Sequence, residues 1–99
     1  MAVIGMAVIG VVTLELRIEQ AHSLKDKRHV VKSLKERLRR KFNVSVAEID
    51  DMDLHNSAVL GVAIVSPSRP FAEKVLQAVE DEAAGLLGPM LIRVEVEWL

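Results

Sequence analysis

The chain has 99 residues, about half of them apolar, with 13 basic and 14 acidic side chains and no cysteine. This length suits one domain with a single two-layer core, and the apolar content argues against disorder. The lack of cysteine excludes a disulfide framework, a thiolate nucleophile and thiolate metal sites. The longest apolar run, residues 1–12, is shorter than the roughly 20 residues that span a bilayer and has no basic leader. We therefore expect one cytoplasmic domain over residues 1–99, with no membrane contact.

The pentapeptide MAVIG occurs twice, at residues 1–5 and 6–10. Five residues are too few for a structural repeat unit. We expect residues 1–5 to be a duplicated extension, with Met6 as the functional start.

The first two predicted elements are a strand and a helix. Residues 12–19 alternate between apolar and polar side chains, which predicts a half-buried strand. Ser23 is a good helix N-cap, and Asp26 lies where a capping-box carboxylate belongs. The helix is expected to run to about Phe42, with Asn43 as its stop. At about 100° per residue its core face spans an arc of about 120°, formed by Leu24, Val30, Val31, Leu34, Leu38 and Phe42.

The second half of the chain begins with a predicted strand at residues 44–50 and a polar hairpin loop at 52–57. Two further strands with a helix between them follow. Residues 58–65 are apolar on both faces, as in a central strand. The run SPSRP at 66–70 leads into a second helix, which Gly88 and Pro89 end. The last strand alternates, with its inward apolar set at Ile92, Val94, Val96 and Trp98.

The predicted order β-α-β-β-α-β is that of an α+β, ferredoxin-like sandwich. Right-handed crossovers place the first and third strands in the centre of a four-stranded antiparallel sheet of order 4-1-3-2. Both helices then cover one face of that sheet.

The predicted first helix concentrates positive charge. Residues 22–42 hold nine basic and two acidic side chains, a net charge of 9 − 2 = +7, whereas the other 78 residues hold four basic and twelve acidic ones, 4 − 12 = −8. On the helical wheel four cations fall within about 60° of one another, with Lys25 alongside. This stripe, called the basic face below, consists of Lys25, Arg28, Lys32, Lys35 and Arg39.

The first turn of this helix is a candidate anion site. Lys25, Lys27 and Arg28 crowd a helix end where the macrodipole already favours anions, and a bound phosphate on Ser23 and the free N–H groups would relieve that repulsion. A net charge of +7 also matches the electrostatic footprint of RNA binding. The alternative is a solvated face that pairs with the acidic second strand or with another subunit. The candidate anion- or RNA-binding residues are Ser23, Lys25, Lys27, Arg28, Lys32, Lys35 and Arg39.

The uncovered face of the sheet predicts self-association. Its expected outward residues include no aromatic ring on which a base would stack, unlike an RNA-recognition motif; they are Thr13, Glu15, Arg17, Arg93, Glu95 and Glu97. The third strand must turn one apolar set toward this face, either Val59, Ala63 and Val65 or Leu60, Val62 and Ile64. Exposed apolar surface flanked by charges favours a homodimer through the sheet.

No arrangement of residues predicts catalysis or a cofactor. Asp51, Asp53 and His55 alternate, but their spacing matches no established metal site, and a polar hairpin tip explains them as well. His22 and His29 are expected at the surface. Glycine-rich phosphate loops, GxSxG and HExxH are absent, as are the arginine loop of acylphosphatases and the CxxC of copper chaperones. We therefore expect a non-enzymatic protein without metal or cofactor.

The stretch HSLKDKRHVVKSLKERLRRKFNVSVAEIDDMDL at residues 22–54 resembles the YlxP-like family, a bacterial family of unknown function. The resemblance extends from Met6 over nearly the whole chain and is most specific at residues 23–28 and 41–48. It implies a ferredoxin-like fold. It also implies a role near translation or ribosome maturation, because genes of the family lie among those for a translation initiation factor and a ribosome-binding factor. The first hypothesis is an accessory factor that binds rRNA or the ribosome, and the alternative is a homo-oligomeric module with a small ligand at the subunit interface.

Overall fold

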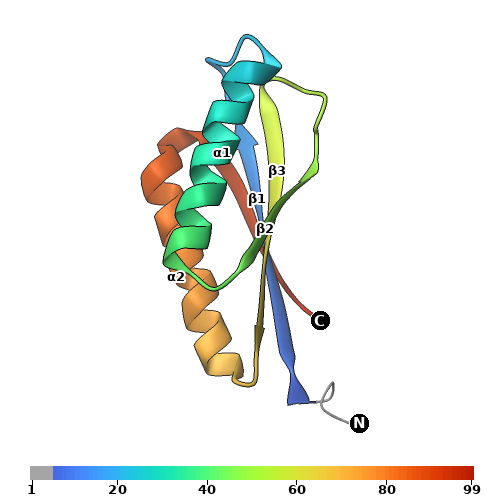
Figure 1. Cartoon of the computed structure of the whole chain (residues 1–99), viewed down its shortest axis with the longest axis vertical. Coiled ribbons are helices and arrows are strands. Elements are labelled where there is room, and N and C mark those ends of the chain that lie inside the picture. The colour runs from blue at the N-terminus through green and yellow to red at the C-terminus, as the bar shows by residue number, and fades with distance from the viewer. Residues whose placement is uncertain (1–5) are drawn as a thin grey trace.

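The computed structural model describes residues 6–99, so the expected extension at residues 1–5 lies outside the described residues. Figure 1 shows the chain order as predicted, with two β-α-β halves. The elements are β1 (Val8–Arg17), α1 (Leu24–Lys41), β2 (Ser45–Asp50), β3 (Ser57–Ser66), α2 (Arg69–Leu87), the 3-10 turn η2 (Gly88–Met90) and β4 (Leu91–Trp98).

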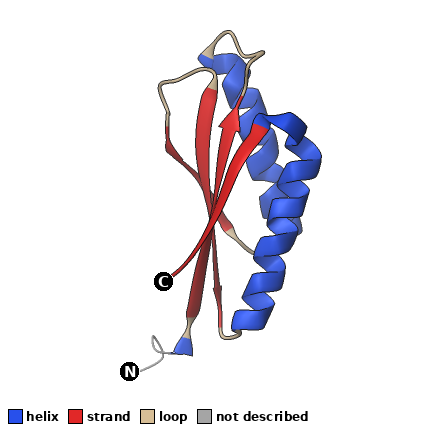
Figure 2. Ribbon diagram, turned by 180° about the vertical axis from the view of Figure 1, so that it is seen from behind, coloured by secondary structure: helices blue, strands red, loops and turns tan. Residues whose placement is uncertain are grey.

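The four strands form one antiparallel sheet of order β2-β3-β1-β4, which is the predicted order read from the other edge. Both helices lie on the same side of this sheet, and its other side carries no helix (Figures 1 and 2). The ferredoxin-like sandwich predicted from the sequence is confirmed.

Both helices begin at serine caps. The Ser23 hydroxyl accepts a hydrogen bond from the Asp26 N–H at 3.1 Å, and Ser68 accepts one from the Phe71 N–H at 3.2 Å. These contacts satisfy N–H groups that a helix leaves unpaired at its first turn. At the other end, α1 stops at Lys41, and Phe42 rather than Asn43 is the extended capping residue.

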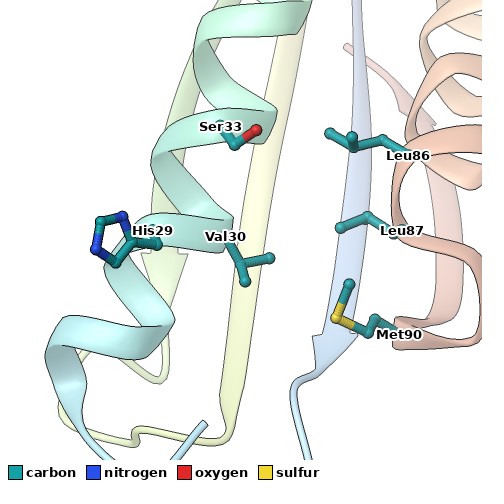
Figure 3. A pocket seen from close by; sticks show the side chains of 6 residues that line it. All are labelled: His29, Val30, Ser33, Leu86, Leu87 and Met90. Atoms are coloured by element: carbon teal, nitrogen blue, oxygen red, sulfur yellow. The ribbon is translucent and has the colours of Figure 1, made fainter. Parts of the chain in front are cut away.

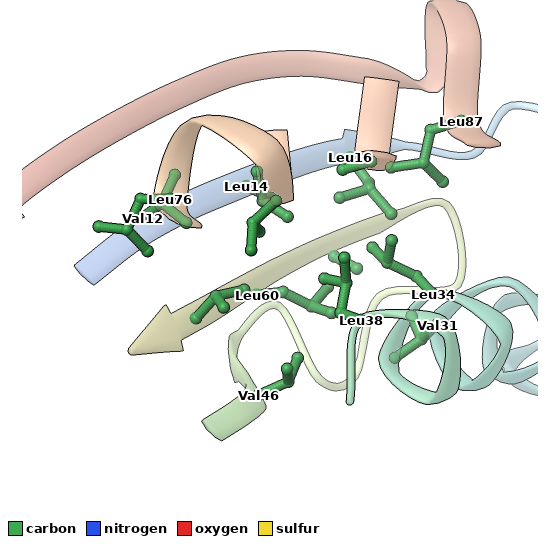
Figure 4. Close-up of a cluster of buried hydrophobic side chains, with 14 of the residues drawn as sticks. Val12, Leu14, Leu16, Val31, Leu34, Leu38, Val46, Leu60, Leu76 and Leu87 are labelled. Carbon is green, nitrogen blue, oxygen red and sulfur yellow. The ribbon is translucent and has the colours of Figure 1, made fainter. Parts of the chain in front are cut away.

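The core lies between the helices and the covered face of the sheet (Figure 4). Leu14 and Leu16 of β1 and Leu34 of α1 are completely buried, and each such side chain contributes roughly 2 kcal/mol of hydrophobic stabilisation. The labelled members of the cluster come from five elements: Val12, Leu14, Leu16, Val31, Leu34, Leu38, Val46, Leu60, Leu76 and Leu87.

The strand register decides which apolar set of β3 faces away from the helices. Ala58, Leu60, Val62 and Ile64 are buried in the core. Since successive side chains of a strand point to opposite faces, the outward set is Val59, Gly61, Ala63 and Val65. Of the two sets considered above, the structure therefore selects Val59, Ala63 and Val65, and Val65 is 71% exposed.

Two predicted core positions in β4, Ile92 and Val96, are exposed. Val96 lies opposite the buried Val12, but at the edge of the sheet it stays 50% exposed. The β1–β4 register shifts between Glu15 and Leu16, so that Leu91 lies opposite Leu16. Leu91 thus packs against the core, and Ile92, which the simple alternation placed inward, is 46% exposed. A bulge of this kind inserts one residue and breaks the period of two.

Candidate nucleic-acid interface

The basic face lies on the flank of α1 that is turned toward the edge strand β2. The buried side of the helix is formed by Val31, Leu34 and Leu38, and the basic face is rotated from it by about a quarter turn. Four of its five members are exposed and Lys35 is half-buried. The structure therefore brings Lys25, Arg28, Lys32, Lys35 and Arg39 together along one helix flank, as predicted.

The members of this face differ in their partners. The Arg39 guanidinium donates to the Val46 carbonyl oxygen at 2.7 Å, which ties the helix to β2. The Lys32 ammonium lies 4.0 Å from the Glu36 carboxylate, with both side chains mostly exposed. Such surface pairs contribute little to stability. Lys25, Arg28 and Lys35 form no ion pair or side-chain hydrogen bond with any residue in the range 6–99.

Two further cations of α1 face the other helix instead. The Lys41 ammonium lies 2.8 Å and the Arg37 guanidinium 3.1 Å from the Glu82 carboxylate of α2. The hydrogen bonds from Lys41 and then Arg37 hold the pKa of Glu82 below its ordinary value. Arg37 and Lys41 are thus used in joining α1 to α2, and the surplus positive charge is left mainly on the β2 side.

The first turn of α1 already contains an anion of its own. The Asp26 carboxylate accepts a hydrogen bond from the His22 backbone N–H at 2.9 Å, while Ser23 caps the Asp26 N–H. The His22 hydrogen bond is the main cause that lowers the pKa of Asp26, aided by Ser23 and by the charges of His22 and His29. In this variant of the capping box the carboxylate binds the N–H of the residue before the cap. The negative charge of Asp26 relieves the conflict with the helix dipole that the sequence suggested.

Lys27 is not part of the exposed basic surface, and its assignment to an anion site is corrected here. Its side chain is 2% exposed. The ammonium donates to the carbonyl oxygens of Asp51 at 2.7 Å, Ser57 at 3.1 Å and Met52 at 3.3 Å, and it lies 2.8 Å from the Glu48 carboxylate. All three donors of the ammonium are used inside the protein.

The helical wheel contained a signal for this buried lysine. At about 100° per residue, Lys27 projects between Leu34 and Leu38, in the middle of the arc assigned to the core. The sequence pattern assigns Lys27 to the anion site with Lys25 and Arg28 because all three are cations, but those two side chains point away from the core. Position on the helix, not charge, decides its environment.

Lys27 orders the connection between β2 and β3. Asp51 adopts a positive φ of 60°, and its carboxylate accepts a hydrogen bond from the Ser57 hydroxyl at 2.8 Å. The loop exposes Met52, Asp53 and Leu54 at its tip. Within the part of the chain that the structure describes, no three His, Asp or Glu side chains converge in a way that would hold a metal ion.

A shallow apolar groove separates the first half of α1 from the end of α2. Its volume is about 240 Å³. Figure 3 shows Val30 pointing toward Leu86, Leu87 and Met90 across this gap, whereas the imidazole of His29 points away from it. His22 and His29 are exposed, as expected. Ser33 of α1 also lines the groove, so its lining is apolar apart from one hydroxyl and the outward-turned imidazole of His29.

Comparison with known proteins gives a family and a fold. The sequence matches the family described as "Protein of unknown function (DUF503)" over residues 9–95. It is 45% identical over 71 residues to "Uncharacterized protein YlxP" of Bacillus subtilis (strain 168), covering 72% of this chain and 77% of that protein.

Two solved structures share the fold at low sequence identity. The de novo designed protein Foldit4 superposes with a TM-score of 0.61 at 18% identity, over 94% of this chain and 96% of the design. The designed protein LFR1 1, described as having a ferredoxin fold, gives 0.56 at 10% identity, over 93% and 82%. No helix within residues 6–99 has the length and apolar character needed to cross a bilayer.

Proposed function

The chain belongs to the DUF503 family, whose function is unknown, and from its surface charge we propose that it is a non-enzymatic cytoplasmic accessory factor that binds RNA phosphates through α1. Ribosomal RNA is the candidate ligand, and ribosome maturation or translation is the candidate setting. The residues proposed to contact phosphates are Lys25, Arg28, Lys32 and Lys35, with Arg39 as the cation nearest β2.

One observation carries this proposal. Lys25, Arg28 and Lys35 lie on one flank of a single rigid helix without ion-pair partners among residues 6–99, although the rest of the chain has a surplus of acidic groups. Like charges on adjacent helix turns repel by a few tenths of a kcal/mol per pair. A polyanion removes this repulsion and releases its own counterions when it binds. Because the Ser23 hydroxyl already caps the Asp26 N–H, we propose that phosphates contact the cations along the flank of α1 and not Ser23.

A charge-reversal variant tests the proposal. We expect Lys25→Glu plus Arg28→Glu to abolish most rRNA binding at 50 mM salt, because two phosphate contacts become repulsive. For the native protein, log K should fall linearly with log salt, and the variant should lower the magnitude of that slope by about 1.5 to 2. Filter binding to an rRNA fragment at several salt concentrations measures both quantities.

The two positions suit this test because both side chains are exposed and Lys25 lies in the first helical turn, where glutamate is favourable, so the variant should stay folded. Arg17→Glu plus Lys74→Glu is the matched control, since it makes the same change in net charge at exposed positions off α1. Equal binding by the native protein and the α1 variant, or an equal loss in the control, would rule out α1 as the contact surface.

A second candidate function, a homo-oligomeric module, is favoured by the uncovered face of the sheet. This open face carries Val59, Ala63 and Val65 of β3 and Ile49 of β2, of which Val65 is 71% and Ile49 is 50% exposed. Charged residues of β1 and β4, including Glu15, border the apolar part. We propose that a second copy of the chain covers this face. The dimer places both α1 helices outside the interface, so it is compatible with RNA binding.

A further inference from the structure

We propose that the outer edge of β4, together with the groove between β4 and α2, binds an extended basic peptide segment of a partner protein as an added strand. This surface lies on the sheet edge opposite to β2 and uses no residue of α1. The proposal is therefore independent of RNA binding.

The two edges of the sheet differ in how well they are protected against the addition of another strand. β2 has only six residues, its register shifts between Glu48 and Asp50, and Arg39 occupies the Val46 carbonyl. Short edge strands, bulges and covering side chains are the usual protection against strand addition. β4 has eight residues and contains no proline or lysine, and because its register shift lies near its start, residues 93–98 form an uninterrupted edge. Figure 2 shows it at the edge of the sheet, leading to the C-terminus.

The hydrogen-bond pattern identifies which backbone groups of β4 face outward. The Leu99 N–H donates to the Ile9 carbonyl of β1 at 2.9 Å, and Glu97 and Glu95 follow in the same register opposite Val11 and Thr13. In an antiparallel pair the alternate residues turn their N–H and C=O groups to the other side. Val94, Val96 and Trp98 therefore present three donors and three acceptors to the outer edge.

A groove beside this edge provides side-chain contacts. It has a volume of about 270 Å³ and lies between α2 and β4. Val96, which is 50% exposed, and the Trp98 indole form its apolar side. The guanidinium of Arg69 stacks on the indole, 3.9 Å from the ring centroid. The groove-side residues of an added strand would thus meet apolar surface.

Charge specifies the partner as basic. Four carboxylates surround the strand: Glu73 and Glu80 lie on the groove side, and Glu95 and Glu97 lie on the open face. Two cations, Arg69 and Arg93, lie among them, so the local net charge is 2 − 4 = −2. Arg69 pairs with Glu73 and Arg93 with Glu95. Glu80 and Glu97, one on each side of the strand, have no ion-pair partner among residues 6–99. A strand whose alternate side chains are apolar toward the groove and cationic toward the open face would place its cations beside Glu97.

The test uses a fluorescein-labelled seven-residue peptide of alternating lysine and valine, with fluorescence anisotropy as the readout. A second peptide carries proline in place of the central valine, because proline cannot complete a strand ladder. We expect the first peptide to bind at least about tenfold more tightly than the second, the effect of losing one or two backbone hydrogen bonds.

Val96→Pro is the matching change in the protein, since it removes an outward N–H and leaves the bonds to β1 intact. This variant should bind the lysine–valine peptide about tenfold less tightly than the native protein does. Glu97→Lys should also reduce the affinity for this peptide. Asp53→Lys, with the same charge change in the β2–β3 loop, should have no effect. Circular dichroism checks the fold of Val96→Pro, and if that variant unfolds, the comparison of the two peptides and Glu97→Lys decide.

Three outcomes would overturn the proposal. The first is that the native protein does not bind the lysine–valine peptide. The second is that it binds both peptides equally, which would mean that the peptide is held by charge attraction alone and not as an added strand. The third is that the free protein is a dimer that Val96→Pro converts to a monomer, which means that the edge is already occupied by a second copy.

Discussion

At the scale of single residues, Lys27 shows that a cation in a basic helix can serve the core. Its ammonium is held by the backbone carbonyls of Asp51, Met52 and Ser57 and by the Glu48 carboxylate. A buried charge is tolerated only when it is paired and hydrogen-bonded, because transfer from water costs several kcal/mol. Lys27 therefore links the first turn of α1 to both ends of the β2–β3 loop.

Replacing Lys27 should destabilise the whole domain. We expect Lys27→Met to lower the free energy of unfolding by about 3 kcal/mol, because three carbonyls and one carboxylate lose their donor. The Glu48 oxygen that lies beside the ammonium is itself buried, so its charge is left without a partner in this variant. Urea denaturation followed by circular dichroism measures it.

The same helix offers a control for this lysine. Lys32 is 75% exposed, so Lys32→Met should change stability by less than about 0.5 kcal/mol. The double variant Lys27→Met plus Glu48→Leu should recover part of the loss, because no carboxylate is left without its cation. Identical urea midpoints for Lys27→Met and Lys32→Met would contradict the role assigned to Lys27.

At the scale of the element, the start of α1 depends on the charge of Asp26. Hydrogen bonding to the His22 N–H lowers its pKa, so the folded state favours the ionised carboxylate. A group whose pKa is lower in the folded state stabilises the protein above its unfolded pKa. This contribution is then lost as the pH falls through the lowered value.

Asp26→Asn separates this effect from general acid denaturation. The variant should melt at a lower temperature than the native protein at neutral pH, and the difference should shrink as the pH falls below about 4. Glu36→Gln, on an exposed position of the same helix, should show no such pH-dependent difference. Melting temperatures between pH 2 and 7, a range chosen around the ordinary carboxyl pKa of about 4, provide the measurement. A constant difference over the whole range would exclude the carboxylate as the cause.

Much of the element order could be predicted because local patterns agree with the fold. The alternation in β1 and the serine caps each point to one structure, and such agreement across levels is typical of natural sequences. The outward set of β3 could not be chosen, since the strand is apolar on both faces and only its register with β1 and β2 decides. Ile92 was misplaced because a bulge in the pairing interrupts the period of two.

At the scale of the molecule, the fold separates its surfaces by chemistry. The basic face of α1 lies toward β2, and apolar side chains gather on the open face of β3. Glu80 and Glu97, which have no ion-pair partner among residues 6–99, flank β4. The four strands have six to ten residues. At about 3.3 Å per residue and about 4.8 Å between strands they give a face of roughly 28 by 19 Å. That footprint of roughly 530 Å² is about two thirds of the about 800 Å² per partner of a standard interface.

The proposed dimer predicts a specific sensitivity to charge on the open face. Ala63→Lys places an ammonium in the centre of that face, where a second copy would have to desolvate it, and should convert the dimer to a monomer. Light scattering after size exclusion measures the mass. Leu54→Lys is the control, because Leu54 is also an apolar side chain, 49% exposed, but lies in the β2–β3 loop. A dimer that survives Ala63→Lys in a folded protein, or a native monomer at high concentration, would exclude the open face as the interface.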